Sequence, residues 1–524
     1  MENTIHQSVK QRWKDYLSGD YVIITAIAFF KLLLHLVNPE YGYHRDELFY
    51  LIISDNLSFN NLDMLPLTPL YLKLVTTLLG TSLKALHFAS ALTGAVALVF
   101  TCLITRQLGG KTFSIALTGL CSLFSGSLIF GALFTYDSLE FLCVTCALYF
   151  LILLFKFDKP VYWIGIGIAL GLGLLNKLTI LFFCLSITVV LLSVSQRKQF
   201  RNKELWIAGG IAFLSLLPFI LWQSNNNWYF MGWAGSYTST ISYASSLPEF
   251  IWNQILPNNV VNLPIWITGL ILLLFSKKWN QYRFFGLNYL FLFLIIFLMG
   301  GKFYFLTPYY TVLLAVGSIG VESAVNRLKS PARKLFQRTL PVVYVLLSCI
   351  TVPMMLPVLP VDLFIKYSQL MGMGADAGVR YENNQINQLP QHFADRFGWE
   401  ELAKKIADLV NDLSFKDREQ LGGILCSNYG EASAINFFRK KHDIPEAISA
   451  HGWYYFHTKQ THKFKDCYIA IPNDVRELEP GFEQVDSIGI FTNLFCMPYE
   501  SNKKIYLCKK PRTDLKALWD TIKH

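Results

Sequence analysis

The sequence has little charge for its length. Only 16% of its 524 residues are charged, against about 25% in an average soluble domain. Hydrophobic residues make up 53% of the chain, and runs such as residues 263–275 (LPIWITGLILLLF) belong in lipid because water cannot solvate them as helices. This composition excludes a disordered chain, a disulfide-dense secreted module and an ordinary soluble enzyme.

Acidic residues are scarce where the apolar runs lie. Residues 1–358 contain 25 Lys and Arg against 14 Asp and Glu, whereas residues 359–524 contain 21 against 22. The net charge of +10 therefore originates among the apolar runs, where the positive-inside bias accounts for it. We expect no nucleic-acid partner.

Cysteine spacing typical of zinc sites is also missing. Cys143 and Cys146 form a CxxC pair, but it lies inside an apolar run, where thiols act as small hydrophobic groups. Four cysteines in the polar C-terminal part allow two disulfides in three connectivities, and spacing cannot choose among these or prove oxidation. They are Cys426, Cys467, Cys496 and Cys508.

Apolar runs of spanning length occur about eleven times. No small-residue cleavage site follows the first, so we expect a retained anchor rather than a signal peptide. The predicted spans are 21–38, 84–106, 113–130, 138–155, 161–175, 178–195, 205–222, 258–276, 284–299, 303–322 and 340–358.

Basic residues orient these spans. With the N-terminus in the cytoplasm, 19 Lys and Arg of residues 1–358 lie on the cytoplasmic side and five lie on the outer side, which satisfies the positive-inside rule. We predict a polytopic α-helical protein of the inner (plasma) membrane. Residues 1–358 form its transmembrane domain, with a first outer loop at 39–83, and residues 359–524 form a soluble extracytoplasmic α/β domain.

The polar parts have their own patterns. Residues 66–80, which are apolar but broken by two prolines, predict an interfacial helix. In the C-terminal part, residues 399–413 have helical periodicity, and residues 421–438 and 466–471 are strand-like, with a turn near Gly430. Glu431 beside that turn is a weaker functional candidate.

A charged cluster follows the first span closely. His44, Arg45, Asp46 and Glu47 are walled by aromatic residues, so the loop is expected against the bilayer surface or in a cavity. A carboxylate here can accept a proton from an acceptor hydroxyl, as a general base does. The aromatic neighbours are Tyr41, Tyr43, Phe49 and Tyr50.

Three further outer positions carry charge. Asp137 fits a helix N-cap, with Glu140 completing a capping box, and also fits a site residue. Lys177 fits either a snorkelling side chain or a phosphate ligand, and Lys302 follows two glycines and precedes Tyr304, which offers a hydroxyl.

An aromatic loop follows residue 221. Its residues suit an interfacial belt as well as they suit stacking on a sugar. They are Trp222, Gln223, Trp228, Trp233 and Tyr237.

Taken in order, these motifs resemble glycosyltransferase family 39, the bacterial protein O-mannosyltransferase-like and lipid A aminoarabinose transferase-like membrane enzymes. The resemblance covers nearly the whole chain. The motifs are YHRDELFYL, PLTPL, TYDSLEF, GLGLLNKLT, PFILWQSNNNW, GKFYFLTPYYTVLLAVG and, in the tail, NYGEASAINFF with HDIPEAISAHGWYYF.

The resemblance implies the GT-C fold and transfer of a hexosyl or pentosyl group from a polyprenyl-phosphate donor outside the cytoplasmic membrane. The acceptor would be an envelope lipid, protein or glycan, and membrane lipids surround the protein. Asp46 matches the family's acidic residue, Asp137 its second aspartate, and Lys177 and Lys302 its phosphate-facing lysines. The substrate-binding candidates that complete the set are His44, Arg45, Tyr304, Tyr309, Trp222 and Gln223.

The chemistry of the residues agrees with a lipid-linked sugar donor. An enzyme outside the cytoplasm has no supply of nucleotide sugar, so a lipid-linked donor must diffuse in the bilayer. We expect inverting displacement at the sugar C1, with Asp46 as base, helped by Glu47, and with Lys177, Lys302 and Arg45 stabilising the departing phosphate. No cofactor is required, and a divalent metal ion is not expected because the leaving group is a single phosphate.

Two other functions are compatible with an apolar chain of this size. A polyprenyl-linked glycan flippase or transporter would place ionisable residues deep in the spans and show repeated halves with broken helices. The intraspan candidates Lys31, His35 and His87 lie toward the outer ends instead, and no repeat is visible. A membrane anchor with a partner-binding tail would leave the 44–47 cluster without a purpose.

Overall fold

The structure is a computed structural model that describes residues 19–37, 41–57, 64–232, 246–372, 379–380 and 386–521. By their contacts, its residues group into two compact units. The bundle unit comprises Met1–Val37, His87–Leu217 and Ser242–Val358, and the C-terminal unit comprises Asn38–Leu86, Pro218–Ile241 and Leu359–His524. The first predicted outer loop thus groups with the C-terminal residues.

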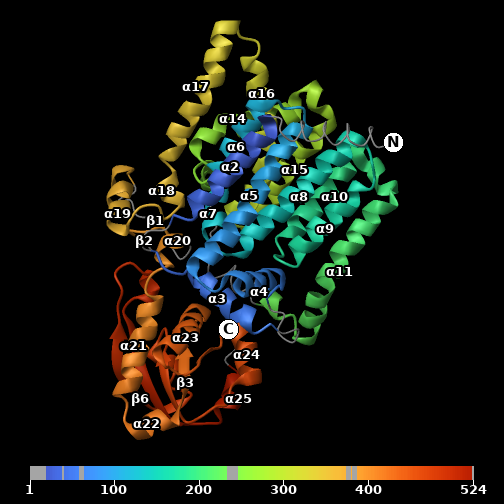
Figure 1. Ribbon diagram of the computed structural model, residues 1–524. Coiled ribbons are helices and arrows are strands. Elements are labelled where there is room, and N and C mark those ends of the chain that lie inside the picture. Colours follow the sequence, from blue (N-terminus) through green and yellow to red (C-terminus); the bar gives the residue numbers. More distant parts are fainter. Residues whose placement is uncertain are drawn as a thin grey trace, which may run out of the picture. The chain divides into compact units, whose positions relative to one another are not determined.

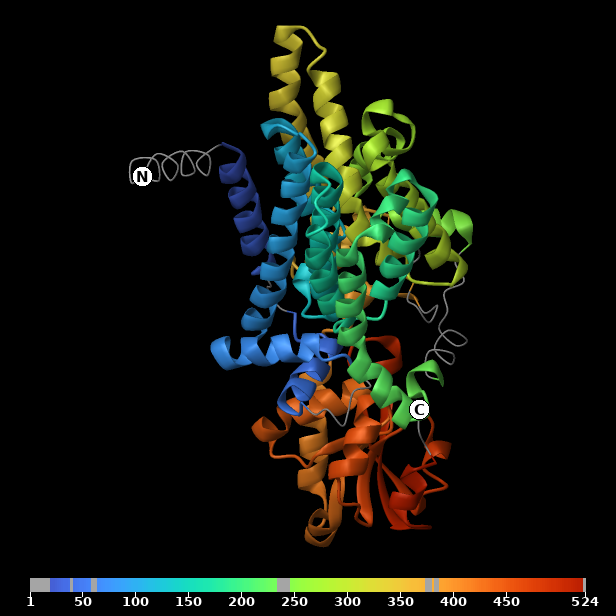
Figure 2. The same ribbon diagram turned by 90° about the vertical axis from the view of Figure 1, so that its right-hand side faces the viewer.

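The bundle unit is all helical, and its helices run beside one another (Figure 1, Figure 2). Its α-helices, including most of α5 and α11, are α2 (Gly19–His35), α5 (Leu83–Gln107), α6 (Thr112–Leu123), α7 (Ser127–Ala132), α8 (Tyr136–Phe157), α9 (Tyr162–Leu174), α10 (Ile180–Ser193), α11 (Lys203–Asn225), α13 (Leu247–Ile255), α14 (Leu263–Phe275), α15 (Arg283–Leu298), α16 (Tyr310–Val325), α17 (Ser330–Cys349) and α18 (Val352–Met355). Its 3-10 helices are η1 (Ser195–Arg201), η2 (Val260–Asn262), η3 (Lys277–Tyr282) and η4 (Phe303–Tyr309).

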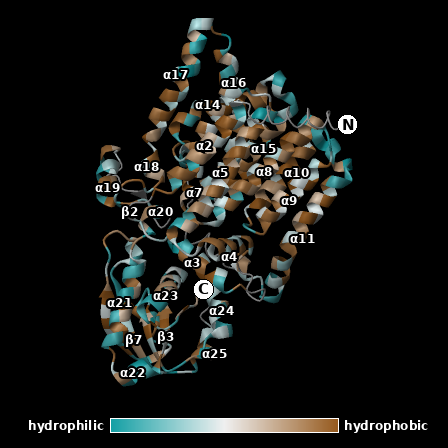
Figure 3. Cartoon of the chain, in the orientation of Figure 1, coloured by the Kyte–Doolittle hydropathy of each residue, from teal (hydrophilic) through white to brown (hydrophobic). Residues whose placement is uncertain are grey.

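The bundle helices are apolar along most of their length (Figure 3), and a helix lies in every predicted span. Several are confirmed as apolar helices of spanning size: by length and composition, five helical stretches of the described chain can cross a membrane. A sixth results if α13 and the segment Val260–Phe275, which meet at 91°, count as one broken span. The total of eleven crossings and their orientation stay predictions.

Helices α14 and α16 pack backbone to backbone. A Cβ on Gly317 would lie 1.9 Å from the carbonyl oxygen of Ile265, and one on Gly269 would lie 2.0 Å from that of Leu313. Glycine is therefore required at both positions for this approach.

The C-terminal unit is an α/β structure, as predicted. Its helices are α3 (Arg45–Asp55), α4 (Leu67–Leu79), α19 (Val361–Leu370), α20 (Gln391–Ala394), α21 (Trp399–Asp412), α22 (Phe415–Gln420), α23 (Tyr429–His442), α24 (Trp453–Thr461), α25 (Leu515–Trp519) and the 3-10 turns η5 (Val475–Glu477) and η6 (Pro498–Glu500). Its strands are β1 (Val379–Arg380), β2 (Ile386–Asn387), β3 (Leu421–Cys426), β4 (Ala447–Ser449), β5 (Cys467–Ile471), β6 (Phe482–Phe491) and β7 (Lys503–Pro511).

The five-stranded sheet has the order β4-β3-β5-β7-β6. Strand β3 is parallel to β4 and β5, whereas β7 is antiparallel to both β5 and β6. Side chains alternate along the strands, so Ile469 packs in one core with α21, α23 and α3, while Tyr468 packs in another with α24 and α25. Helix α3 of the first predicted outer loop is therefore part of the domain core.

Local predictions in this unit are mostly confirmed. Helix α21, strands β3 and β5, and a helix at 66–80 (α4) occur where the sequence predicts them. The strand-like interpretation of 421–438 is wrong beyond residue 428. There Asn428 accepts hydrogen bonds from two backbone amides and so starts α23.

Candidate active-site residues

The start of α3 is held by a reciprocal cap. His44 Nδ1 accepts a hydrogen bond from the amide of Asp46 at 3.1 Å, and Glu47 accepts one from the amide of His44 at 2.9 Å. This is the geometry of a capping box, with His44 in place of the usual hydroxyl residue. Glu47 is fully buried, so its observed contact is with the backbone, and the catalytic role predicted for it stays a prediction.

Asp46 is the most exposed of the four charged residues, at 26% of its side chain. The hydroxyl of Tyr429 donates to Asp46 Oδ1 at 2.8 Å. Among the described residues no donor bonds to Oδ2. His44 Nδ1 lies 3.9 Å from Oδ2 and already accepts from a backbone amide. Asp46 thus combines one carboxylate oxygen fixed by Tyr429 with a second that is not held by a hydrogen bond in the described part of the chain.

Arg45 is held by three remote segments. Its Nη1 donates to the hydroxyl of Tyr499 at 2.8 Å, its Nη2 lies 3.4 Å from Asp395 Oδ2, and its guanidinium lies 5.3 Å from the ring centre of Tyr429. Burial by itself would lower the pKa of Arg45, but the Asp395 carboxylate and its neighbours outweigh that effect and raise it. Burial raises the pKa of Asp395, and the charge of Arg45 opposes this.

The bundle unit contains a second charged cluster. Lys177 Nζ lies 2.6 Å from Asp137 Oδ1 and 2.9 Å from Glu140 Oε2, and the three side chains are 11%, 16% and 5% exposed. The ammonium also lies 4.6 Å from the ring of Tyr136 and 4.7 Å from that of Phe305. Burial would lower the pKa of Lys177, but the two carboxylates raise it. The cluster therefore holds one ammonium between two carboxyl groups.

The capping box predicted for Asp137 and Glu140 is not formed. Thr135 caps α8 by accepting from the amide of Asp137, and Glu140 instead accepts from Lys177 and from Thr179. The sequence spacing suited a cap, but the approach of the 175–179 turn offers Glu140 a charged partner, which is the stronger interaction.

Lys302 and Tyr304 lie beside the Lys177 cluster. Lys302 Nζ lies 5.7 Å from the ring centre of Tyr304, and Lys177 Nζ lies 5.4 Å from it. Tyr309 is fully buried between Tyr289 and Phe183, and its hydroxyl has no hydrogen-bond partner among the described residues. The structure thus brings Asp137, Lys177, Lys302 and Tyr304 together and places Tyr309 in the bundle core.

Trp222 and Gln223 have local partners. Trp222 packs edge to face on Phe456, 5.0 Å between ring centres, inside the core on the α24 face of the sheet. Gln223 accepts from the amide of Phe230 and so closes the turn after α11. Of the aromatic loop, Trp228 is half exposed, whereas Trp233 and Tyr237 lie outside the described residues. Stacking on a sugar by these residues stays a prediction.

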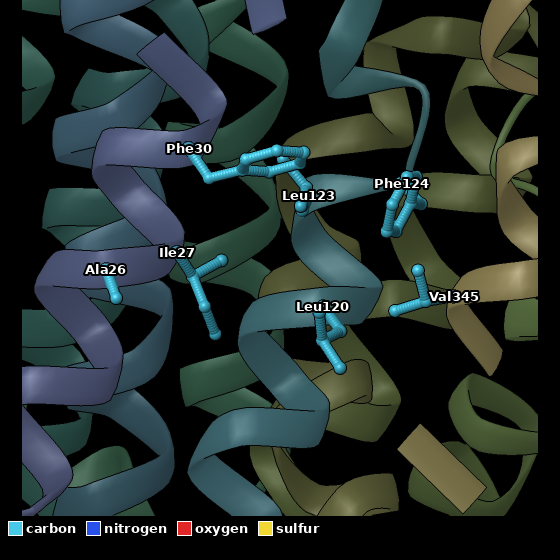
Figure 4. A pocket seen from close by; sticks show the side chains of 7 residues that line it. All are labelled: Ala26, Ile27, Phe30, Leu120, Leu123, Phe124 and Val345. Atoms are coloured by element: carbon cyan, nitrogen blue, oxygen red, sulfur yellow. The ribbon is translucent and has the colours of Figure 1, made fainter. Parts of the chain in front are cut away.

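An apolar cavity of about 230 Å³ opens between α2, α6 and α17 (Figure 4). Its wall consists of Ala26, Ile27, Phe30, Leu120, Leu123, Phe124 and Val345. No polar side chain is in this wall, so the cavity suits hydrocarbon and not a reacting sugar.

All ten cysteines, each of which lies in the described part of the chain, are free. Within the same described part, no group of three His, Cys, Asp or Glu side chains is arranged to hold a metal ion.

Comparison with known proteins adds a family and a fold. Residues 63–222 match the family model for dolichyl-phosphate-mannose-protein mannosyltransferases. The structure of ArnT from Cupriavidus metallidurans is similar over 94% of this chain and 98% of that one, with a TM-score of 0.55 and 12% identity. The archaeal oligosaccharyltransferase AglB from Archaeoglobus fulgidus is similar over 89% and 70% of the two chains, with a TM-score of 0.53 and 11% identity.

The resemblance to GT-C membrane glycosyltransferases is confirmed. At these identities the solved structures establish the GT-C fold and not the substrate. The chain matches none of the curated protein sequences compared.

The sequence did not predict several residues of the two charged clusters. Asp395 and Tyr499 lie in segments without any motif, so no signal in the sequence could have found them. Tyr429 precedes Gly430 in the turn that the sequence predicts near residue 430. The spacing of Glu140 predicts only a structural role for it.

Proposed function

We propose that the chain is a membrane glycosyltransferase that transfers a sugar from a polyprenyl-phosphate donor to an envelope acceptor outside the cytoplasmic membrane. The observation that carries the proposal is Asp46, a partly exposed carboxylate in the loop where the family has its acidic residue. One of its oxygens accepts from Tyr429, and the other accepts no hydrogen bond from the residues that the structure describes. The acceptor class is a lipid, a protein or a glycan.

The donor class is supported by two structures with the same fold. ArnT from Cupriavidus metallidurans has been solved bound to undecaprenyl phosphate. That structure is similar to 93% of this chain, with a TM-score of 0.54 and 14% identity. AglB was solved with a dolichol-phosphate and an inhibitory peptide. A polyprenyl chain is hydrocarbon, and the cavity between α2, α6 and α17 is lined by groups that suit hydrocarbon.

In the proposed reaction the acceptor oxygen attacks the sugar C1 with inversion. The bond from C1 to the phosphate oxygen breaks, polyprenyl phosphate leaves, and Asp46 takes the proton of the acceptor hydroxyl through Oδ2. Tyr429 orients the carboxylate by donating to Oδ1, and the Arg45 guanidinium lies 4.0 Å from the same oxygen. No metal ion or cofactor is assigned to this reaction.

The bundle residues take separate roles in the proposal. Lys177 is neutralised by Asp137 and Glu140, so we assign it to fixing those carboxylates as well as to contact with the donor. Lys302 is the second candidate for the donor phosphate, because its positive charge lies next to the Tyr304 ring, which also faces Lys177.

The test is transfer by purified protein from a synthetic polyprenyl-phosphate sugar. Asp46→Asn keeps the size of the side chain and should lower turnover by about 100-fold or more, the scale of lost general-base catalysis. Asp55→Asn is the matched control: it lies on the same helix, its carboxylate is exposed, and its partner is the exposed Lys73. Near-normal turnover by Asp46→Asn would remove Asp46 from the mechanism.

A further inference from the structure

The sheet of the C-terminal unit reverses its strand order at β3. The chain runs from β3 through α23 to β4 on one side, then through α24 to β5 on the other side of β3. In open α/β sheets, ligands bind outside the carboxyl ends of the parallel strands at such a reversal. The carboxyl ends of β3 and β5 are therefore the place to look for a site in this unit.

Polar residues fill this edge of the sheet. Asn428, after β3, caps α23 and also donates to Glu500 at 3.0 Å. Lys503 lies 3.0 Å from Glu431 and donates to Asn473, which follows β5, at 2.9 Å. These contacts fix the first turn of α23, and with it the residue that begins the helix, Tyr429.

Tyr429 reaches from this edge to the start of α3. Its hydroxyl donates to Asp46, and its ring lies 4.8 Å from that of Phe49 and 5.3 Å from the Arg45 guanidinium. A Cβ on Gly430 would lie 2.5 Å from Arg45 Cδ, so the missing side chain at 430 makes room for Arg45. The turn found in the sequence thus faces the charged loop 44–47.

The protonation state of Tyr429 suits a donor. Burial raises its pKa well above the ordinary value, with the Arg45 charge opposing this and Asp46 adding to it. The hydroxyl therefore keeps its proton at neutral pH and can only donate to the carboxylate, which accepts.

We propose that Tyr429 is a positioning residue for Asp46, and that the acceptor hydroxyl meets Asp46 at the carboxyl edge of β3. This deepens the proposed function and rests on it. Tyr429 fixes Oδ1, which turns Oδ2 toward the acceptor, so the C-terminal sheet is part of the active site rather than a separate partner-binding tail.

The experiment uses full-length protein in lipid nanodiscs with a polyprenyl-phosphate sugar and measures kcat and KM. Tyr429→Phe keeps the ring packed on Phe49 and removes only the hydroxyl. We expect kcat to fall about 10-fold or more, the scale of a hydrogen bond to a charged group, with KM for the donor unchanged. Tyr506→Phe, on strand β7 of the same sheet, is the matched control and should keep the wild-type rate.

A double variant separates positioning from general damage. If Tyr429 acts through Asp46, adding Tyr429→Phe to Asp46→Asn should change the rate by less than about twofold, because the two losses share one mechanism. If the rate losses of the two single variants multiply in the double variant, or if Tyr429→Phe keeps the wild-type kcat, the inference is overturned, although the proposed transferase activity is not. A wild-type protein without transfer activity would overturn the proposed function and this inference with it.

Discussion

Replacing Lys177 by Met tests the charged cluster of the bundle most directly. Methionine keeps the length and apolar stem of lysine, so the contacts with Tyr136 and Phe305 survive while the ammonium is lost. Asp137 and Glu140 then face each other without a shared cation, at sites that are 16% and 5% exposed.

The size of the effect follows from this burial. Removing one partner of a buried ion pair costs about 3–5 kcal/mol, because it leaves an uncompensated charge. The matched control is Lys73→Met. The ion pair of Lys73 with Asp55 has the same 2.9 Å separation as that of Lys177 with Glu140, but its side chains are 47% and 66% exposed. An exposed pair contributes about 0–1 kcal/mol, so the control should unfold almost as wild type does.

The assay is thermal unfolding of the purified protein in detergent, with a rescue variant. Adding Asp137→Asn and Glu140→Gln to Lys177→Met removes the stranded charges and should recover most of the lost stability. If Lys177→Met unfolds at the wild-type temperature, or if the neutral substitutions add further loss, the cluster does not stabilise the bundle as its distances imply.

Three more predictions follow from single residues. Lys302→Ala should weaken use of the donor by roughly 2–4 kcal/mol in kcat/KM, with Lys302→Arg partly active, and equal kcat/KM in the wild type and the alanine variant would count against the phosphate role. Glu500→Gln should flatten the pH dependence of unfolding. Burial and the neighbouring Glu431 raise the pKa of Glu500 well above the ordinary value, so its contribution to stability is present at low pH and is lost as pH rises above about 4.3. An equal slope of unfolding free energy against pH in both proteins would contradict this. Gly317→Ala should destabilise the bundle by about 1–3 kcal/mol, since its Cβ meets the Ile265 carbonyl, whereas Gly210→Ala on α11, with open space around its Cβ, should not; equal melting temperatures would refute the close packing.

Hydrophobic periodicity was enough to locate the elements. The apolar runs predict the bundle helices, since a run too long and too apolar for water must pack in lipid or protein whatever surrounds it. The same local logic predicts α21 and strands β3 and β5. It also selects Asp46, Asp137 and Lys177 as candidates, because charges beside apolar runs are costly without a function.

Pairings between remote segments were decided only by the tertiary structure. Glu140 fits a cap by spacing, yet it binds Lys177, 37 residues away. Trp222 fits a stacking residue, yet it fills the core beside Phe456. In both cases a local pattern was compatible with two partners, and the stronger contact came from another part of the chain.

The neighbourhood of Asp46 shows the same division. The sequence by itself determined that a carboxylate follows the first helix in an aromatic loop. It did not determine that Tyr429, 383 residues later, donates to that carboxylate, or that Asp395 and Tyr499 hold Arg45. Those contacts depend on the path of the chain through the C-terminal sheet, and a hydrogen bond over such a separation leaves no periodicity in the sequence.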